Sequence, residues 1–153
     1  MKIKLITLIM STFVLFGCGM AAQMEETDAL IESFYAERIK EQNVEYYYAQ
    51  MFWDATSEQE WENINKLVAK AHGQLKSHDQ VTWNLKSISH TNQLSGTFVS
   101  YVYNAHYDIG TVVEHLTLFR EDDEDEFKII SHRFDSAKIK ELVNQGIQQI
   151  ATE

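Results

Sequence analysis

The sequence predicts a single α+β domain in which helices come first, an antiparallel sheet follows and a last helix ends the chain. Apolar residues recur at the helical period up to Gly73 and at every second position between residues 81 and 134. A third observation is composition. The 153 residues are 44% hydrophobic and 12% aromatic, which is enough for one buried core and argues against disorder.

The first helical region is expected to be one long or broken helix. Apolar side chains at helical spacing occupy residues 30–39, and the same spacing resumes over residues 44–52. A polar step at residues 41–43 separates the two parts.

The second helix has clear start and stop signals. Within residues 56–60, Ser57 is placed to cap the exposed amides while Glu60 reaches back as a capping box. An apolar stripe follows and ends before Gly73. Helices commonly end at a glycine in the left-handed conformation, so Gly73 is the expected C-terminal cap. We therefore expect a helix from about residue 57 to residue 72.

Four strands are predicted from alternating and β-branched segments at residues 81–85, 97–109, 111–120 and 127–134. Short links favour antiparallel hairpins and hence a meander. These links are residues 90–96, a turn containing Ile109–Gly110, and the acidic stretch of residues 121–126. Residues 136–150 return to helical spacing and predict the last helix.

The N-terminus has the features of a secretory signal. Lys2 and Lys4 precede an apolar run over residues 5–16, which is shorter than the roughly 20 residues of a spanning helix. The tetrapeptide Leu15-Phe16-Gly17-Cys18 then resembles the bacterial lipobox. This resemblance implies cleavage before Cys18, acylation with fatty acids such as palmitate, and attachment to the membrane. The resemblance also implies the outer membrane, with the protein facing the periplasm, because the residue after the cysteine is Gly19 and not Asp.

The expected organisation is therefore a signal peptide at residues 1–17, a tether at residues 18–27 and a folded domain at residues 28–153. The tether is predicted because its residues show no apolar periodicity. Thirteen basic and 23 acidic residues give a formal charge of −10, which falls to −12 without Lys2 and Lys4. Such a charge repels phosphate, so nucleic acid is not an expected partner.

The order of elements resembles the nuclear-transport-factor-2-like superfamily, also called the cystatin-like α+β or cone fold, and in particular its small secreted bacterial members. Trp53 closes the early helices, and the strands that carry the resemblance lie at residues 98–103, 110–119 and 127–130. The resemblance covers residues 28–134 and implies a curved sheet that closes against the helices around a cavity. The last helix departs from the simplest members, and a helix at this point of the chain could cover the exposed face of the sheet, through which members of the family dimerise.

A two-residue loop at Ile109–Gly110 would place Asp108 opposite Thr111. The more apolar face of the sheet then carries Val99, Tyr101, Tyr103, Ala105 and Tyr107 together with Val112, Glu114, Leu116 and Leu118. The resemblance implies that Tyr101, Tyr103 and Glu114 line the cavity. Burial among aromatic rings would raise the pKa of Glu114 unless it is paired, and Arg133 becomes that partner if the next hairpin places it beside Glu114.

Other groups of residues are weaker candidates for a ligand or metal site. Trp53 belongs to a set of aromatic residues at positions 46–48, 52 and 53. Most of these side chains are expected to pack in the core, and the remainder to line a pocket. His106, His115 and Asp108 are residue types that bind zinc, but we expect them to form part of a polar surface. The acidic residues 121–126 lack the spaced ligands of a calcium loop. We expect no cofactor and no metal.

Three classes of function are compatible with the sequence. The favoured one is a non-catalytic lipoprotein that presents its domain to a small apolar ligand or an envelope protein. The alternative is an isomerase or dehydratase that uses Glu114 and tyrosines for acid-base chemistry. The third is a purely structural or assembly role. A nucleophilic enzyme finds no support, because Cys18 is consumed by lipid and no Gly-x-Ser-x-Gly motif occurs.

Overall fold

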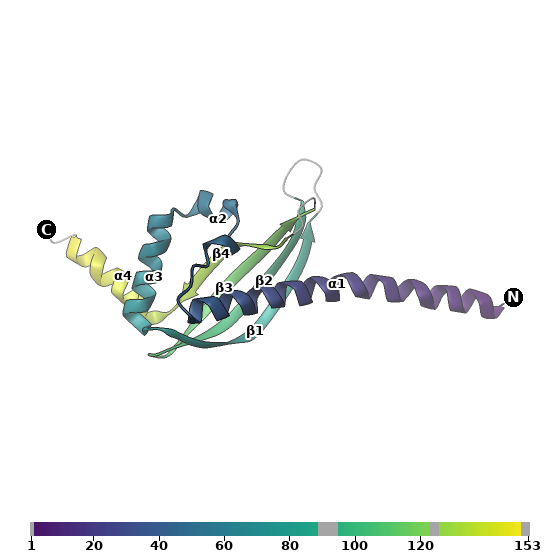
Figure 1. Cartoon of the computed structure of the whole chain (residues 1–153), viewed down its shortest axis with the longest axis horizontal. Coiled ribbons are helices and arrows are strands. Elements are labelled where there is room, and N and C mark those ends of the chain that lie inside the picture. The colour runs from purple at the N-terminus through teal and green to yellow at the C-terminus, as the bar shows by residue number, and fades with distance from the viewer. Residues whose placement is uncertain (1, 89–94, 123–125, 151–153) are drawn as a thin grey trace. The chain divides into compact units, whose positions relative to one another are not determined.

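The computed structural model describes residues 2–88, 95–122 and 126–150. Figure 1 shows helices and an antiparallel sheet, so the α+β prediction is confirmed. The elements in order are α1 (Lys2–Ile39), the 3-10 helix η1 (Glu45–Tyr47), α2 (Gln50–Ala55), α3 (Glu58–His72), β1 (Leu75–Ile88), β2 (Gly96–Tyr107), β3 (Thr111–Glu121), β4 (Lys128–Asp135) and α4 (Ala137–Ile150). Most of the predicted link at residues 90–96, and residues 123–125 of the acidic stretch, lie outside the described residues.

The chain divides into two compact units, Met1–Ser33 and Phe34–Glu153. The described residues of the first unit belong to α1, and residues 18–27, which the sequence analysis assigns to a tether, are helical. The reason is that this segment contains strong helix formers, among them Ala21, Ala22, Met24 and Glu25, although it lacks an apolar stripe. No helix among the described residues combines the length and the apolar composition needed to cross a membrane.

The polar step after α1 breaks the helix, as the sequence allowed. Glu41 takes a positive φ of 55°, and Gln42 N–H donates back to the carbonyl of Glu37 at 3.0 Å. The chain then turns through η1 and α2 instead of resuming α1. The Ala49 N–H donates to the carbonyl of Ile129 at 2.9 Å, which fixes this segment on β4.

The predicted caps of α3 are both present. Ser57 and Glu60 form the capping box, with Ser57 N–H donating to Glu60 Oε2 at 2.9 Å. Gly73 ends the helix at φ 79°, and a Cβ there would lie 2.7 Å from the Asp108 carboxylate. A larger residue at Gly73 would therefore be strained and would displace the turn between β2 and β3.

The four strands pair in the order β1-β2-β3-β4, the predicted meander. His106 pairs with Thr111, so the loop between β2 and β3 is longer than the expected two residues and the register differs by two positions. A shift of two leaves every side chain on its expected face. The predicted apolar face is consequently correct, and Tyr103 lies opposite Glu114. We call this apolar face, which carries Tyr103 and Glu114, the inner face of the sheet.

The pairing of β3 with β4 corrects the prediction for Arg133. Glu114 lies opposite Phe134, and Arg133 lies opposite His115 on the other, outer face, where its side chain is exposed. The inner face instead receives His132, which is opposite Leu116. An offset of one residue is enough to exchange the two faces, and the acidic link before β4 contains no turn motif that would fix the register.

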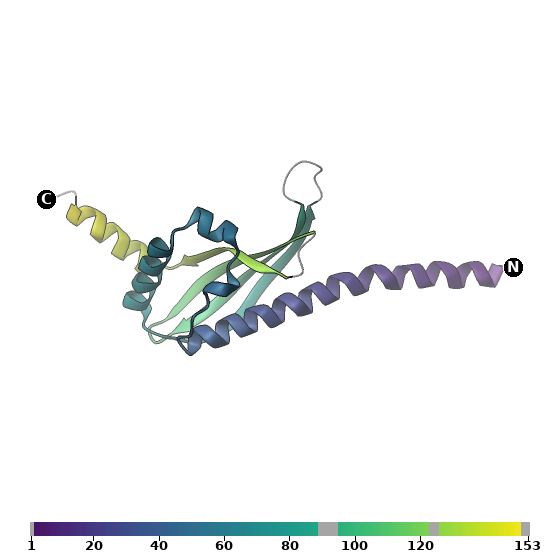
Figure 2. The ribbon, with the colours of Figure 1, turned by 45° about the horizontal axis from the view of Figure 1, so that its top comes forward.

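The last helix packs on α3, not over the outer face of the sheet. Figure 2 shows α4 running away from the sheet beyond the end of β4. Buried His72 at the end of α3 ties this corner together, because its Nδ1 lies 2.7 Å from the carbonyl oxygen of Ile109 and its Nε2 lies 2.7 Å from Ser136 Oγ. The last helix therefore does not take the position over the exposed face of the sheet that the sequence left open to it.

Candidate functional site

A buried carboxylate lies at the centre of the inner face of the sheet. The Glu114 side chain has no exposed surface and accepts hydrogen bonds from four side chains. Arg38 Nη1 and His132 Nε2 reach Oε2 at 2.6 and 3.0 Å, Tyr35 OH reaches the same oxygen at 3.0 Å, and Tyr107 OH reaches Oε1 at 2.7 Å. We call these five residues the Glu114 cluster.

The cluster is assembled from four elements of the second unit. Tyr35 and Arg38 lie three residues apart on the last turns of α1 and therefore share one helix face. Tyr107 ends β2, Glu114 lies within β3, and His132 lies within β4. Neighbouring inner-face positions of the sheet thus converge on residues of a single helical turn.

The charges of the cluster balance. Burial by itself would raise the pKa of Glu114, but the Arg38 charge and the hydrogen bonds from His132 and Arg38 outweigh it and hold that pKa well below its usual range. Arg38 remains protonated, and its Nη2 also donates to Tyr107 OH at 3.0 Å. Glu114 is therefore an ionised acceptor that carries no proton to transfer at neutral pH.

The ionised carboxylate also fixes the tautomer of His132. Glu114 only accepts, so His132 Nε2 carries the proton and Nδ1 presents a lone pair. Tyr48 OH lies 2.9 Å from Nδ1 and must be the donor. Burial lowers the pKa of His132, and the neighbouring Glu114 only partly opposes this effect. The result is a directed chain of hydrogen bonds from Tyr48 through neutral His132 to Glu114.

Aromatic rings enclose the imidazole of His132. Phe134, Trp61 and Phe34 lie with ring centroids 4.5, 5.2 and 5.8 Å from it. The guanidinium of Arg38 lies 5.3 Å from the centroid of the Phe34 ring. These contacts keep water away from His132, whose side chain has no exposed surface, and this makes its hydrogen bonds more costly to break.

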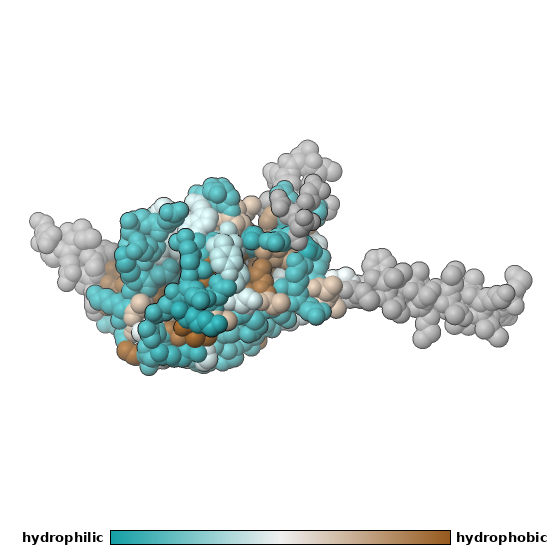
Figure 3. Space-filling view, viewed as in Figure 1, coloured by the Kyte–Doolittle hydropathy of each residue, from teal (hydrophilic) through white to brown (hydrophobic). Residues whose placement is uncertain are grey.

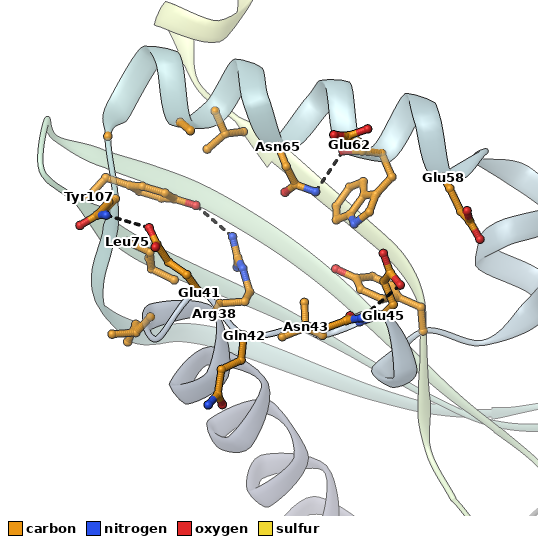
Figure 4. A pocket seen from close by; sticks show the side chains of 18 residues that line it. Arg38, Glu41, Gln42, Asn43, Glu45, Glu58, Glu62, Asn65, Leu75 and Tyr107 are labelled. Carbon is orange, nitrogen blue, oxygen red and sulfur yellow. Dashed lines mark hydrogen bonds between the residues drawn. The ribbon is translucent and has the colours of Figure 1, made fainter.

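An open pocket of about 700 Å³ lies beside the cluster. Figure 4 shows α3 on one side of this pocket and the segment after α1 on the other, with Arg38 and Tyr107 between them. Tyr48 and Trp61 also contribute to its lining, so four lining side chains belong to the cluster or contact it. The further lining residues are Ile39, Glu41, Gln42, Asn43, Val44, Glu45, Glu58, Glu62, Asn65, Val68, Ala69, Gly73, Gln74 and Leu75.

Four carboxylates surround the pocket, from Glu58 and Glu62 on α3 and from Glu41 and Glu45 after α1 (Figure 4). Glu62 is paired with Lys66, whereas no cationic partner of the other three occurs among the described residues. The lining includes one basic residue, Arg38, and Glu114 already compensates its charge. The pocket therefore presents a negative potential together with apolar walls.

The structure distributes the predicted pocket residues differently. Tyr101, Tyr103 and Glu114 are all buried on the inner face, but none of the three lines the pocket. Trp53 is half-buried beside Tyr48, with ring centroids 5.6 Å apart, and also lies outside the lining. Arg133 is on the outer face.

Sequence reasoning missed Arg38, Tyr35, Tyr107 and His132 as partners of Glu114. One signal was present, because Arg38 occupies a position within the apolar stripe of α1, where a charged side chain needs a buried partner. The pocket lining had no comparable signal, since it combines α3 with an irregular segment after α1.

The outer face carries hydrogen-bonded polar side chains. His106 Nε2 lies 2.5 Å from Asp79 Oδ1, and His106 Nδ1 lies 3.0 Å from Thr111 Oγ1. The predicted trio of His106, His115 and Asp108 is not brought together, because Asp108 instead accepts from Gln74 N–H and pairs with Lys76. Within the described ranges, no three histidine, cysteine or acidic side chains are arranged to hold a metal.

Comparisons with known proteins leave these features to be judged on their own chemistry. No family model, curated protein or solved structure matches the chain.

Proposed function

We propose that this chain is a membrane-anchored bacterial lipoprotein whose folded part binds a small organic molecule without transforming it. Cys18 is the site of lipid attachment, and the lipobox-like sequence before it supports this. The outer membrane is the proposed location, with the domain in the periplasm. The pocket of about 700 Å³ beside the Glu114 cluster is the observation that carries the binding function.

The lining of the pocket favours a ligand with an apolar body and a positive charge. Trp61, Val68 and Leu75 supply apolar surface, while the carboxylates around the opening attract a cation. A purely apolar ligand would displace water from these carboxylates without replacing their hydrogen bonds. An anion would be repelled, because the Arg38 charge is already compensated by Glu114.

Acid-base catalysis is less well supported by the same geometry. A general acid or base needs a proton to exchange and a path to the substrate. Glu114 is ionised, fully buried and engaged by four donors. The arrangement is that of a structural centre, so we do not retain the isomerase or dehydratase alternative as the proposed function.

Binding is tested by calorimetry with three probes of similar size: benzyltrimethylammonium, benzyl alcohol and benzoate. The cation is expected to bind most tightly, and added salt should weaken its binding. The double variant Glu58→Gln with Glu62→Gln should reduce the affinity for the cation. Glu126→Gln, an exposed acid paired with Lys128 outside the pocket, is the matched control and should have no effect. Equal binding of all three probes, or none at all, would overturn the proposal.

Lipid attachment is tested separately by growing cells with a fatty-acid analogue that can be labelled. The wild type should take up the label and migrate as the cleaved form. Cys18→Ser should be neither labelled nor cleaved. Equal labelling of the two proteins would end the lipoprotein proposal and leave the binding proposal standing.

A further inference from the structure

The wall of the pocket formed by Tyr48 and Trp61 rests on His132. The Tyr48 hydroxyl donates to His132 Nδ1 at 2.9 Å, and the Trp61 ring lies 5.2 Å from the imidazole centroid. The His132 side chain has no exposed surface. Two pocket-lining side chains therefore separate this imidazole from the space in the pocket.

The charge of the cluster permits only neutral His132. Arg38 and Glu114 already balance each other at 2.6 Å. One more proton, on Nδ1, would leave an uncompensated positive charge in a site that water does not reach, and such a charge is strongly unfavourable. It would also remove the lone pair to which Tyr48 donates.

We propose that His132 is a proton-sensitive latch: its protonation releases the Tyr48 segment, residues 44–56, and opens the wall of the pocket while the sheet remains folded. This inference concerns the pocket of the proposed function, but it does not depend on which ligand the pocket takes.

The Tyr48 segment has fewer backbone hydrogen bonds to the sheet than the strands have to one another, although Tyr47, Tyr48 and Phe52 are buried. It consists of η1 and the short helix α2, and its backbone is attached to the sheet through Ala49 N–H and the carbonyl of Ile129. The three strand pairs are held by continuous ladders. Moving the segment would let water reach the protonated imidazole at a smaller cost than opening the sheet.

The groups that face His132 come from every element packed around it. On α1 these are Arg38 and, through the shared carboxylate, Tyr35. Tyr48 faces it from the segment itself, and Glu114 from β3 with Tyr107 of β2 on the same carboxylate. The neighbours on α3 and β4 are the rings of Trp61 and Phe134. Glu114 favours protonation, whereas burial and the Arg38 charge oppose it.

The experiment uses the full chain with Trp53→Phe and Trp83→Phe, which leaves Trp61 as the sole tryptophan. Acrylamide quenching of Trp61 fluorescence is measured as the pH is lowered from 7, with the far-ultraviolet circular dichroism signal of the sheet recorded on the same samples. Quenching is expected to rise at least twofold below the ordinary histidine pKa of 6.5, while the dichroism signal is unchanged. Simultaneous change of both signals would show global unfolding and overturn the latch.

Two further variants keep the test decisive. His132→Gln should abolish the rise in quenching, and His115→Gln on the outer face should leave it intact. If His132→Gln does not fold, Tyr48→Phe decides: it removes the donor to neutral His132 and should move the opening to a higher pH. An unchanged midpoint in Tyr48→Phe would overturn the latch. These readouts involve no ligand, so they stand or fall separately from the calorimetry.

Discussion

Two carboxylates on opposite faces of the sheet each contact a histidine, and their surroundings differ completely. Glu114 on the inner face has no exposed surface and lies 3.0 Å from His132 Nε2. Asp79 on the outer face lies 2.5 Å from His106 Nε2, and both of these side chains are about half exposed, at 57% and 41%. Asp79 also accepts from Asn104 at 3.2 Å.

The comparison shows that burial, not the type of contact, decides how much such a group matters. Water can replace any partner that Asp79 loses, so the pair with His106 contributes little. Nothing can replace a partner that Glu114 loses, because its side chain has no surface open to solvent. Figure 3 shows the same distinction at larger scale, since polar residues cover most of the visible surface and hydrophobic ones appear in small patches.

The largest effect is expected from removing one charge of the buried pair. Glu114→Gln leaves Arg38 without its counter-ion, and Arg38→Met leaves Glu114 without its own. Each change should lower the free energy of unfolding by about 3 to 5 kcal/mol. Urea denaturation of the purified chain measures this. A denaturation midpoint of Glu114→Gln at or above that of the wild type would mean that the carboxylate is strained in the fold instead of stabilising it.

Two controls sharpen this result. Arg133→Met removes an exposed arginine from the outer face and should leave the midpoint almost unchanged. The double variant Arg38→Met with Glu114→Gln removes both charges and should lose less than the sum of the single changes. Additive losses would show that the two residues do not act as a pair.

Much of the fold was predictable because it depends on local patterns. The capping box at Ser57, the positive φ at Gly73 and the alternation along β2 and β3 each follow from a few neighbouring residues. The partner of Glu114 was not predictable in the same way. Arg38 is 76 residues away in sequence, and a shift of one residue in the β4 register exchanges Arg133 for His132 on the inner face.

Only part of the candidate site could therefore be predicted from the sequence. Glu114 was identified because alternation places it among apolar residues. The pocket was not, because its lining joins α3 to an irregular segment whose path depends on the break at Glu41. Alternation assigns a residue to a face of the sheet, but it does not say which helix residues meet that face.

A smaller effect is expected when Glu114 loses a single neutral donor. Tyr35→Phe removes the hydroxyl that donates to Oε2 at 3.0 Å and leaves the ring in place. A hydrogen bond to a charged group contributes about 1.5 to 3 kcal/mol, and we expect a loss in that range. The control is Tyr46→Phe. Tyr46 is exposed and its hydroxyl donates to Glu37, so its removal should leave the free energy of unfolding almost unchanged. Equal losses in the two variants would contradict the role of burial. Urea denaturation of both proteins provides the measurement.

Acid should destabilise the inner cluster in two stages. The pKa of His132 is lowered in the fold, so the unfolded chain takes up its proton first and the free energy of unfolding falls as pH drops below 6.5. The pKa of Glu114 is also lowered, and its contribution, present above 4.5, is lost as the pH falls further. Urea midpoints at a series of pH values test this. His132→Gln should lack the first stage, and a wild-type midpoint that rises on acidification would contradict both stages.

The smallest effect is expected on the outer face. Asp79→Asn removes the charge next to His106, whose hydrogen bond holds the pKa of Asp79 below its usual range. Because both side chains are open to solvent, water and dissolved ions take over the interactions that are lost. We expect no measurable change in the urea midpoint at neutral pH, either at low or at high salt. A loss that approaches that of Glu114→Gln would show that exposure does not separate the two carboxylates, and the comparison would then have to rest on their strands and not on their solvent contact.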